Sequence, residues 1–215
     1  MLVGRNCKNT QQPRYHENMK INFDILYQAF PTGLRTDITS LINTVDLKYD
    51  LDSSGSFQVC LSKEKLTIPY RVYYDSKRLI DTKGLNQIQK DILNCILTRH
   101  HDGFIREKCL IDILKSDKEW TSPFIFQLIG EYVLELDKII LNNLDKNNIH
   151  KLTKLIIDNP DFAEKTESRV ISYWDCYYRN EYPKKEDFVG LKIIRLLKDE
   201  IKNKQTAAPN TQYSQ

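Results

Sequence analysis

The spacing of hydrophobic residues changes twice along the chain and divides it into three parts. Between Asn22 and Val45, apolar residues recur every three or four positions, which is the period of an amphipathic helix. Pro31 and Gly33 interrupt this run, because both residues disfavour a continuous helix. The first part of the chain therefore predicts two short helices.

The second part shows the two-residue period of β-strands. Apolar and polar residues alternate over Leu47–Leu51 and again over Phe57–Leu61, and the turn-forming residues Ser53–Gly55 lie between these runs. A third alternating run covers Leu66–Tyr74, where Pro69 favours the edge of a sheet. Together the three runs predict a small three-stranded antiparallel meander.

The third part has helical spacing from Gly84 almost to the end of the chain. One long helix is predicted over Pro123–Leu144, largely buried, with Gly130 in its interior close to another helix or a ligand. Asn159 and Pro160 should end the helix that precedes them. The predicted helices cover residues 85–100, 104–114, 123–144, 149–158, 166–182 and 186–201.

These patterns predict an α+β protein that is predominantly α, with a small sheet followed by an irregular helical array. Residues 21–82 hold the two short helices and the meander, and residues 83–202 hold the array; the two parts are expected to form one compact unit. Residues 1–20 form a basic arm that is expected to be flexible, and the polar segment 203–215 is expected to be disordered.

Composition narrows the class of protein without identifying a reaction. The chain has 215 residues, 40% of them hydrophobic and 28% charged, as in ordinary globular proteins. Its five cysteines form no C-x-x-C pair, which favours reduced thiols over a disulfide framework. No apolar run reaches the roughly 20 residues that cross a bilayer, and the first residues lack the apolar core of a signal peptide. We therefore expect a cytoplasmic protein without a membrane partner.

The net charge is positive, but it lies at one end of the chain. The formal charge of the whole chain is +3, and residues 1–20 alone account for +3, through four basic residues and Glu17. The remaining 195 residues are formally neutral. An extended basic groove for nucleic-acid phosphates is therefore disfavoured for the body of the protein.

The segment Arg99–Glu107 is the first candidate for chemistry, because it places His100 and His101 beside a turn. The carboxylate of Asp102 can orient the ring of the histidine before it, or favour the protonated form of that ring. A pocket that also gathers Glu131 would make the protein an enzyme or a small-ligand-binding protein. No third metal ligand occurs at a recognised spacing, and no cofactor-binding or catalytic motif is present in the chain. We expect neither a metal nor a cofactor.

The same segment also has an explanation without chemistry. Asp102 can cap the exposed amides of the next helix, and Gly103 can adopt a positive φ in the turn before it. The run Asp102–Arg106 resembles the inter-helix junction of HEAT-type repeats, in which an acidic turn residue precedes a hydrophobic residue and an arginine. This resemblance covers one helical pair and implies helix pairing and a protein-binding surface. No second copy of the pattern is evident, so a regular solenoid is not expected.

A wider resemblance extends over Ile68–Leu197, which is similar to bacterial proteins of unassigned function. It rests on Arg99–Glu107, Trp120–Phe124 and Ser172–Arg179. It implies no catalytic residue.

An aromatic segment, Ser172–Arg179, is the second candidate site. Aromatic residues occupy nearly every side of the predicted helix here, and their amphipathic rings suit a helical core, protein hot spots and base stacking alike. Asp175 and Arg179 are four residues apart and should form an ion pair on the helix surface.

The carboxylates Glu131 and Glu135 would lie on one face of the long predicted helix. Paired carboxylates can serve acid–base chemistry, but neither is followed by the histidine of a di-iron motif. They can instead pair with Arg99, Arg106 or Arg169 inside the array, where such a network specifies packing.

The leading hypothesis is an interaction or adaptor module that binds another protein through a polar and aromatic face of the helical array. The first alternative is the pocket around His100, His101, Asp102 and Glu131. The second is a nucleic-acid-binding protein that uses the basic N-terminal arm and the tyrosine-rich helix. Candidate pocket or binding residues are His100, His101, Asp102, Arg106, Glu131, Trp174, Tyr177, Tyr178 and Arg179.

Overall fold

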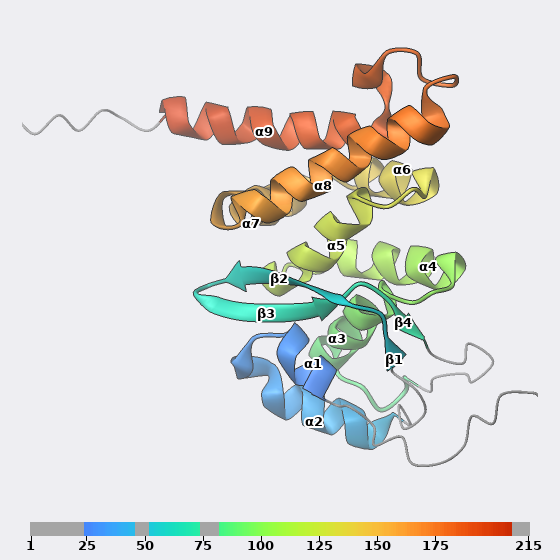
Figure 1. Cartoon of the computed structure of the whole chain (residues 1–215). Coiled ribbons are helices and arrows are strands. Elements are labelled where there is room, and N and C mark those ends of the chain that lie inside the picture. The colour runs from blue at the N-terminus through green and yellow to red at the C-terminus, as the bar shows by residue number, and fades with distance from the viewer. Residues whose placement is uncertain (1–23, 46–51, 74–81, 208–215) are drawn as a thin grey trace, which may run out of the picture.

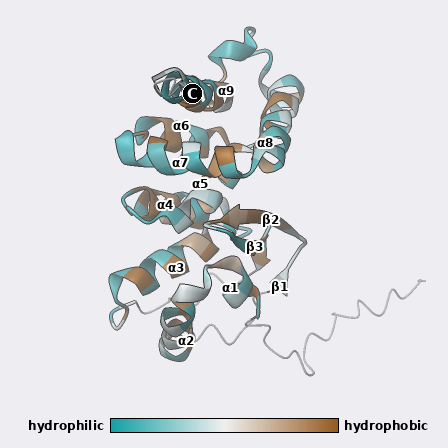
Figure 2. Ribbon diagram, turned by 90° about the vertical axis from the view of Figure 1, so that its left-hand side faces the viewer, coloured by the Kyte–Doolittle hydropathy of each residue, from teal (hydrophilic) through white to brown (hydrophobic). Residues whose placement is uncertain are grey.

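The computed structural model describes residues 24–45, 52–73 and 82–207. It confirms an α+β protein that is predominantly α. The elements stack along one long axis roughly in chain order, from α2 (Arg35–Thr44) at one end, through a β-hairpin, to α9 (Val189–Ala207) at the other (Figure 1). Figure 2 shows the same stack from the side, with brown hydrophobic residues on β2 (Ser56–Leu61) and a mixture of teal and brown on the helices beside it. The predicted arm at residues 1–20 and the segment 208–215 lie outside the described residues.

Two helices form the N-terminal end, as predicted. Helix α1 covers Asp24–Ala29 and helix α2 covers Arg35–Thr44, with a short 3-10 turn, η1, at Thr32–Leu34 between them. The buried ring of Phe30, just after α1, contacts the rings of Trp120 and Phe124 at centroid distances of 5.6 and 5.1 Å. These ring contacts join the N-terminal helices to the helical array.

The described strands form one long antiparallel hairpin. Strands β1 (Asp52–Ser53) and β2 (Ser56–Leu61) lie on one arm, and β3 (Glu64–Pro69) and β4 (Val72–Tyr73) lie on the other. One register pairs both arms, since β1 pairs with β4 and β2 pairs with β3 in continuous succession. The apolar alternation predicted for Phe57–Leu61 is confirmed, because its odd-numbered residues are buried.

The predicted turn of this hairpin is wrong. The chain reverses at Ser62 and Lys63, which have φ values of 50° and 70°. The predicted turn, Ser53–Gly55, instead interrupts one arm of the hairpin, where Gly55 has a φ of 60°. The predicted strand Leu47–Leu51 lies outside the described residues, so the described part of the chain contains a hairpin where a three-stranded meander was expected.

The rest of the chain forms the helical array. Its α-helices are α3 (Gln87–Leu97), α4 (Gly103–Leu114), α5 (Ser122–Ile129), α6 (Leu134–Asn142), α7 (Lys146–Asp158), α8 (Pro160–Tyr173) and α9 (Val189–Ala207). Shorter turns are η2 (Glu119–Thr121), the π-helical turn η3 (Trp174–Tyr178) and η4 (Lys185–Asp187). None of the helices in the described ranges is long and apolar enough to cross a membrane.

The single long helix predicted over Pro123–Leu144 is wrong. Helix α5 ends at Ile129, Gly130 follows as its C-cap, and α6 begins only at Leu134. A methyl group added to Gly130 would lie 3.1 Å from the Cγ2 atom of Thr166 on α8. The expected close approach of another helix at Gly130 is therefore present, but it occurs at a break between two helices.

The boundaries of two further helices differ from the prediction. Helix α8 begins at Pro160 rather than Thr166, because proline is well suited to the first turn of a helix, and it ends at Tyr173 rather than Tyr182. Helix α9 continues to Ala207, so the predicted disorder is wrong for residues 203–207. The apolar stripe of α9 packs upstream of this extension, where Ile193 and Leu197 are fully buried, whereas residues 202–206 are exposed.

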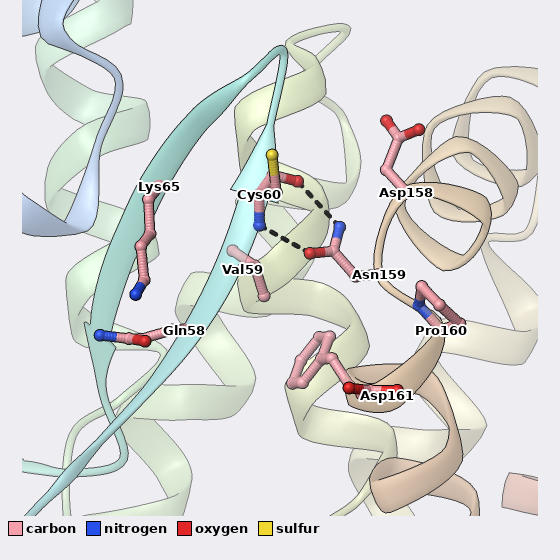
Figure 3. Close-up of a pocket in the computed structure, with 9 residues that line it drawn as sticks. Gln58, Val59, Cys60, Lys65, Asp158, Asn159, Pro160 and Asp161 are labelled. Carbon is pink, nitrogen blue, oxygen red and sulfur yellow. Dashed lines mark hydrogen bonds between the residues drawn. The ribbon is translucent and has the colours of Figure 1, made fainter.

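Asn159 ties the hairpin to the helical array (Figure 3). Its side-chain carbonyl accepts a hydrogen bond from the amide of Cys60 at 2.6 Å, and its side-chain amide donates to the Cys60 carbonyl at 2.8 Å. The same amide also donates to the carbonyl of Leu155 at 3.0 Å. Asn159 thus occupies the outer edge of β2 as a neighbouring strand would, beside a hollow of about 420 Å³.

Replacing Asn159 by alanine is expected to lower the free energy of unfolding by about 1–3 kcal/mol, because backbone groups of Cys60 and Leu155 lose their partner. Urea denaturation followed by circular dichroism measures the loss. Asp158→Ala is the control, since it changes an exposed side chain of the same hollow. Equal stability of the two variants would show that solvent replaces the Asn159 hydrogen bonds without cost.

Candidate functional site

The junction between α3 and α4 extends the hairpin. The amide of Val72 in β4 donates to the carbonyl of Arg99 at 2.8 Å, and the amide of His101 donates to the carbonyl of Val72 at 3.1 Å. These bonds form an isolated parallel bridge between Val72 and His100. The junction is therefore held by backbone pairing, which places the side chains of Arg99, His100 and His101 beside β4.

Most of the contacts of His100, His101 and Asp102 hold the junction itself. The buried His100 ring accepts, at Nδ1, a hydrogen bond of 3.0 Å from the Asp102 amide. His101 is exposed, and its ring lies against those of His100 and Tyr73 at 4.3 and 5.4 Å. Asp102 caps α4 by accepting from the Phe104 amide at 2.9 Å. The predicted cap is confirmed.

The predicted positive φ of Gly103 is wrong. Gly103 is the first residue of α4 and is not among the glycines with positive φ. Arg106, on the first turns of the same helix, closes the junction by donating from Nη1 to the carbonyls of His100 and His101 at 2.8 and 3.0 Å.

Three arginines from separate elements converge on one buried carboxylate, and we call this group the arginine cluster: Arg71, Arg99, Arg106 and Glu131. Arg99 and Arg71 both bond the Oε1 atom of Glu131, the latter at 2.8 Å, and Arg106 Nε lies 3.4 Å from its Oε2 atom. Arg99 is fully buried, Arg106 and Glu131 are nearly so, and the Arg71 side chain is 25% exposed. The cluster thus opens to solvent at Arg71.

Burial and mutual repulsion act against the charges of the cluster. Burial lowers the pKa of Arg99 to about 10, Glu131 raises it, and the neighbouring Arg71, Arg106 and Arg169 lower it further. Burial likewise lowers the pKa of Arg106, against a raising effect of Glu131. With a pKa of about 10, Arg99 stays charged at neutral pH, and both guanidinium groups depend on Glu131 to compensate their charge.

A fourth arginine, Arg169 on α8, lies beside the cluster but contacts neutral groups. Its Nη2 atom donates to Gln127 Oε1 and Thr166 Oγ1, each at 3.1 Å. Its guanidinium group lies over the ring of Tyr70 at 5.9 Å. Arg169 thus adds positive charge to this region without an acidic partner among its described contacts.

The π-helical turn η3 is anchored at two points. The indole of Trp174 donates to the carbonyl of Tyr182 at 2.8 Å, and the hydroxyl of Tyr178 donates to the carbonyl of Tyr132 at 2.7 Å. The Tyr178 ring also stacks on Phe188 at 5.1 Å. These residues fix η3 against the start of α9 and against the loop that follows Glu131.

Two further rings of this region are exposed, and a third, that of Tyr173, is partly exposed. Tyr132 is 58% exposed and Tyr177 is 68% exposed, and both rings lie against that of Tyr173 at 6.0 and 6.3 Å. Tyr132 directly follows Glu131, so this cluster of rings adjoins the arginine cluster. We call the surface formed by Arg71, Tyr132, Tyr173 and Tyr177 the arginine–tyrosine face.

The structure gathers part of the predicted site. His100, His101, Asp102 and Arg106 form the junction, and Arg106 connects it to Glu131. Tyr177 lies in the adjoining exposed cluster, whereas Trp174 and Tyr178 make structural anchors.

Two predicted pairings have opposite outcomes. The predicted pair of Arg179 with Asp175 is confirmed, and Arg179 also lies over the Trp174 ring at 5.1 Å. The pairing of Glu131 with Glu135 on one helical face is wrong, because Glu131 lies in the break before α6 and is buried whereas Glu135 is exposed.

Arg71 and Tyr132 were missed by the sequence analysis. Arg71 reaches Glu131 from the short link between β3 and β4, which is distant in sequence, so no local pattern marks it. Tyr132 was hidden by the assumption of a continuous helix. The usable signal was the sequence Gly130–Glu131, in which a helix-weakening residue precedes a polar residue within a strongly apolar stretch.

Two hollows in the described part of the chain lie away from the arginine cluster. The larger, of about 1020 Å³, is a groove along α3 and α4, and its polar rim includes Lys115 and Lys118, which pair with Asp112 and Asp117. The smaller adjoins Asn159. Neither is lined by His100, His101 or Glu131. Among the described residues, no three His, Cys, Asp or Glu side chains come together as a metal site.

Comparison with models of known protein families, with curated proteins and with solved structures finds no match for this chain.

Proposed function

We propose that the protein is an interaction module that binds a partner protein through the arginine–tyrosine face. The observation that carries this proposal is the cluster of the exposed rings of Tyr132 and Tyr177 with the partly exposed ring of Tyr173, beside the partly exposed Arg71. Tyrosine and arginine are enriched among the residues that dominate binding energy at protein interfaces. Exposed rings gathered in one place are therefore better explained by a partner than by folding.

The support beneath this face is rigid. Tyr178 and Trp174 hold the π-helical turn by hydrogen bonds to the backbone, and the arginine cluster fixes the loop that carries Tyr132. A rigid aromatic surface loses little conformational entropy on binding. Single π-helical turns also occur often at functional sites. These features favour a preformed binding surface over a loop that orders only on contact.

Site-specific photo-crosslinking tests this function. A photoreactive phenylalanine analogue replaces Tyr177, Tyr132 or Ile157, the last being 57% exposed on α7 and serving as the control. In a lysate of the native host, positions 177 and 132 are expected to capture the same protein, and position 157 is not. Capture from all three positions alike, or from none, would contradict the proposal.

The captured partner is then purified and its affinity measured by titration calorimetry. Replacing both Tyr132 and Tyr177 by serine is expected to weaken binding at least tenfold, or about 1.4 kcal/mol. Ile157→Ser should leave the affinity within about twofold, because it removes a single exposed apolar side chain outside the face. An unchanged affinity in the tyrosine variant would remove the arginine–tyrosine face as the binding surface.

A further inference from the structure

The arginine cluster and its surroundings carry more positive than negative charge. Arg71, Arg99 and Arg106 share the single carboxylate of Glu131, and Arg169 bonds neutral groups. Asp137 compensates little, because burial raises its pKa well above the ordinary value and Glu131 raises it further, which favours its neutral form. Buried charges are costly unless they are paired. This region therefore attracts an acidic group.

Several hydrogen-bond donors of these arginines are also unused. Within the described part of the chain, the Nε and Nη1 groups of Arg99 and the Nε groups of Arg106 and Arg169 have no hydrogen-bond acceptor. Arg99 is fully buried and Arg106 is 4% exposed. Arg71, at the opening of the cluster, bonds Tyr70 and Glu131 through Nη1, and its other donors have no acceptor among the described residues. Its remaining donors can take up a second acidic group from solvent.

We propose that the partner segment is acidic, and that a carboxylate or a phosphorylated side chain of that segment binds Arg71 at the opening of the arginine cluster. This inference rests on the proposed function and names the chemistry of its partner. The excess of arginines attracts the acidic group, and the planar guanidinium of Arg71 matches its paired oxygens. The flanking rings of Tyr132, Tyr173 and Tyr177 take up the apolar parts of the same segment.

A protein segment fits this surface better than a nucleic acid. Nucleic-acid binding draws on a track of positive charge that follows many phosphates. Here the positive charge is concentrated where three arginines meet one glutamate, and residues 21–215 as a whole are formally neutral. A protein segment that offers one acidic side chain together with apolar contacts is complementary to this localised positive charge and the aromatic rings beside it.

The test uses the full chain and a fluorescent random copolymer of glutamate and tyrosine as the acidic probe. Fluorescence anisotropy is expected to show binding that weakens as salt rises. Arg71→Gln should weaken it at least tenfold, whereas Arg71→Lys, which keeps the charge, should lose less. Arg195→Gln is the matched control, because Arg195 is an exposed arginine on α9. Circular dichroism shows that each variant is folded.

Three outcomes would overturn the inference: no binding of the copolymer, equal binding by Arg71→Gln and Arg195→Gln, or tighter binding of a single-stranded oligouridylate than of the copolymer. Competition by millimolar inorganic phosphate but not by acetate would assign the site to phosphorylated segments. Competition by both would assign it to carboxylates and phosphates alike.

The two proposals fail separately. If the crosslinked partner depends on Tyr132 and Tyr177 but not on Arg71, the interaction module stands and the acidic segment is wrong. If the copolymer depends on Arg71 but no protein is captured at the tyrosines, the acidic site stands and the interaction module is wrong.

Discussion

Replacing Glu131 by alanine is expected to lower the free energy of unfolding by about 3–5 kcal/mol, more than an ordinary surface change. The physical reason is that one carboxylate compensates Arg99, Arg106 and Arg71, of which Arg99 is fully buried. Without it, positive charges remain in the interior with no acidic contact. Urea denaturation of the purified variant measures the loss, and Glu135→Ala, which changes an exposed carboxylate, should cost less than about 0.5 kcal/mol.

A double-mutant cycle separates the charge effect from simple loss of packing. Arg99→Met should cost less than Glu131→Ala, because Glu131 then still contacts Arg71 and Arg106. Combining the two substitutions should give a protein more stable than Glu131→Ala alone, since the uncompensated buried charge of Arg99 has been removed. Strictly additive losses would mean that Glu131 acts through volume and hydrogen bonds rather than through its charge.

Local signals predicted much of the helical array. The apolar stripes of α3, α4 and α7 follow the helical period over their full lengths, and Asp102 at the start of α4 is a cap residue that binds the amide beyond it. Each of these features is decided within a few residues of chain. Helix boundaries are predicted less well where a tertiary contact competes with the local pattern. At Gly130, α8 packs so close to the chain that little room is left for a side chain.

The hairpin shows why strand pairing is harder to predict than strand periodicity. Ser53–Gly55 has the composition of a turn, whereas the true turn uses Ser62 and Lys63, neither of which is a residue that favours positive φ. The choice between the two is made by packing, because the observed register places Val59 opposite Leu66 and Phe57 opposite Ile68, all of them buried. That preference depends on the helices beneath the hairpin and is not visible in the local sequence.

The candidate site also has a part that local sequence predicts and a part that depends on long-range packing. Arg99 and Arg106 flank one helix junction, so their meeting with Glu131 was a plausible pairing of charges inside the array. Arg71 joins them only because the hairpin register and the Val72–His100 bridge bring β4 beside that junction. The residue that opens the arginine cluster to solvent is therefore the one whose position depends on the longest-range contacts.

A second large effect is expected from pH, through the buried Lys151 on α7. Its Nζ atom donates to the carbonyl of Ser116 at 2.8 Å and to Thr121 Oγ1 at 3.1 Å, and the residue is only 2% exposed. Burial lowers the pKa of Lys151 to about 8, although the nearby acidic Asp145, Asp91 and Asp117 raise it. Burial itself raises the pKa of the Cys95 thiol well above the ordinary value, which keeps it neutral.

The sign of the pH effect follows from which state binds the proton more tightly. Below pH 8 Lys151 is protonated in both states, and the folded protein bears the full cost of the buried charge. Between pH 8 and the unfolded pKa of 10.5, the folded state releases the proton first, so stability rises with pH over this window. The difference between the two pKa values corresponds to about 3 kcal/mol at roughly 1.4 kcal/mol per pH unit.

Comparison with Lys151→Met isolates this contribution, because methionine fills a similar volume without a titrating group. Urea unfolding of both proteins at pH 7, 8, 9 and 10 gives the difference in their free energies of unfolding. That difference should shift in favour of the wild-type protein by about 2 kcal/mol or more across the series. Titration of other lysines and tyrosines changes both proteins equally and cancels. If the difference in unfolding free energy stayed constant with pH, Lys151 would have an ordinary pKa. Its ammonium group would then be hydrated in the folded protein as well as hydrogen-bonded to Ser116 and Thr121.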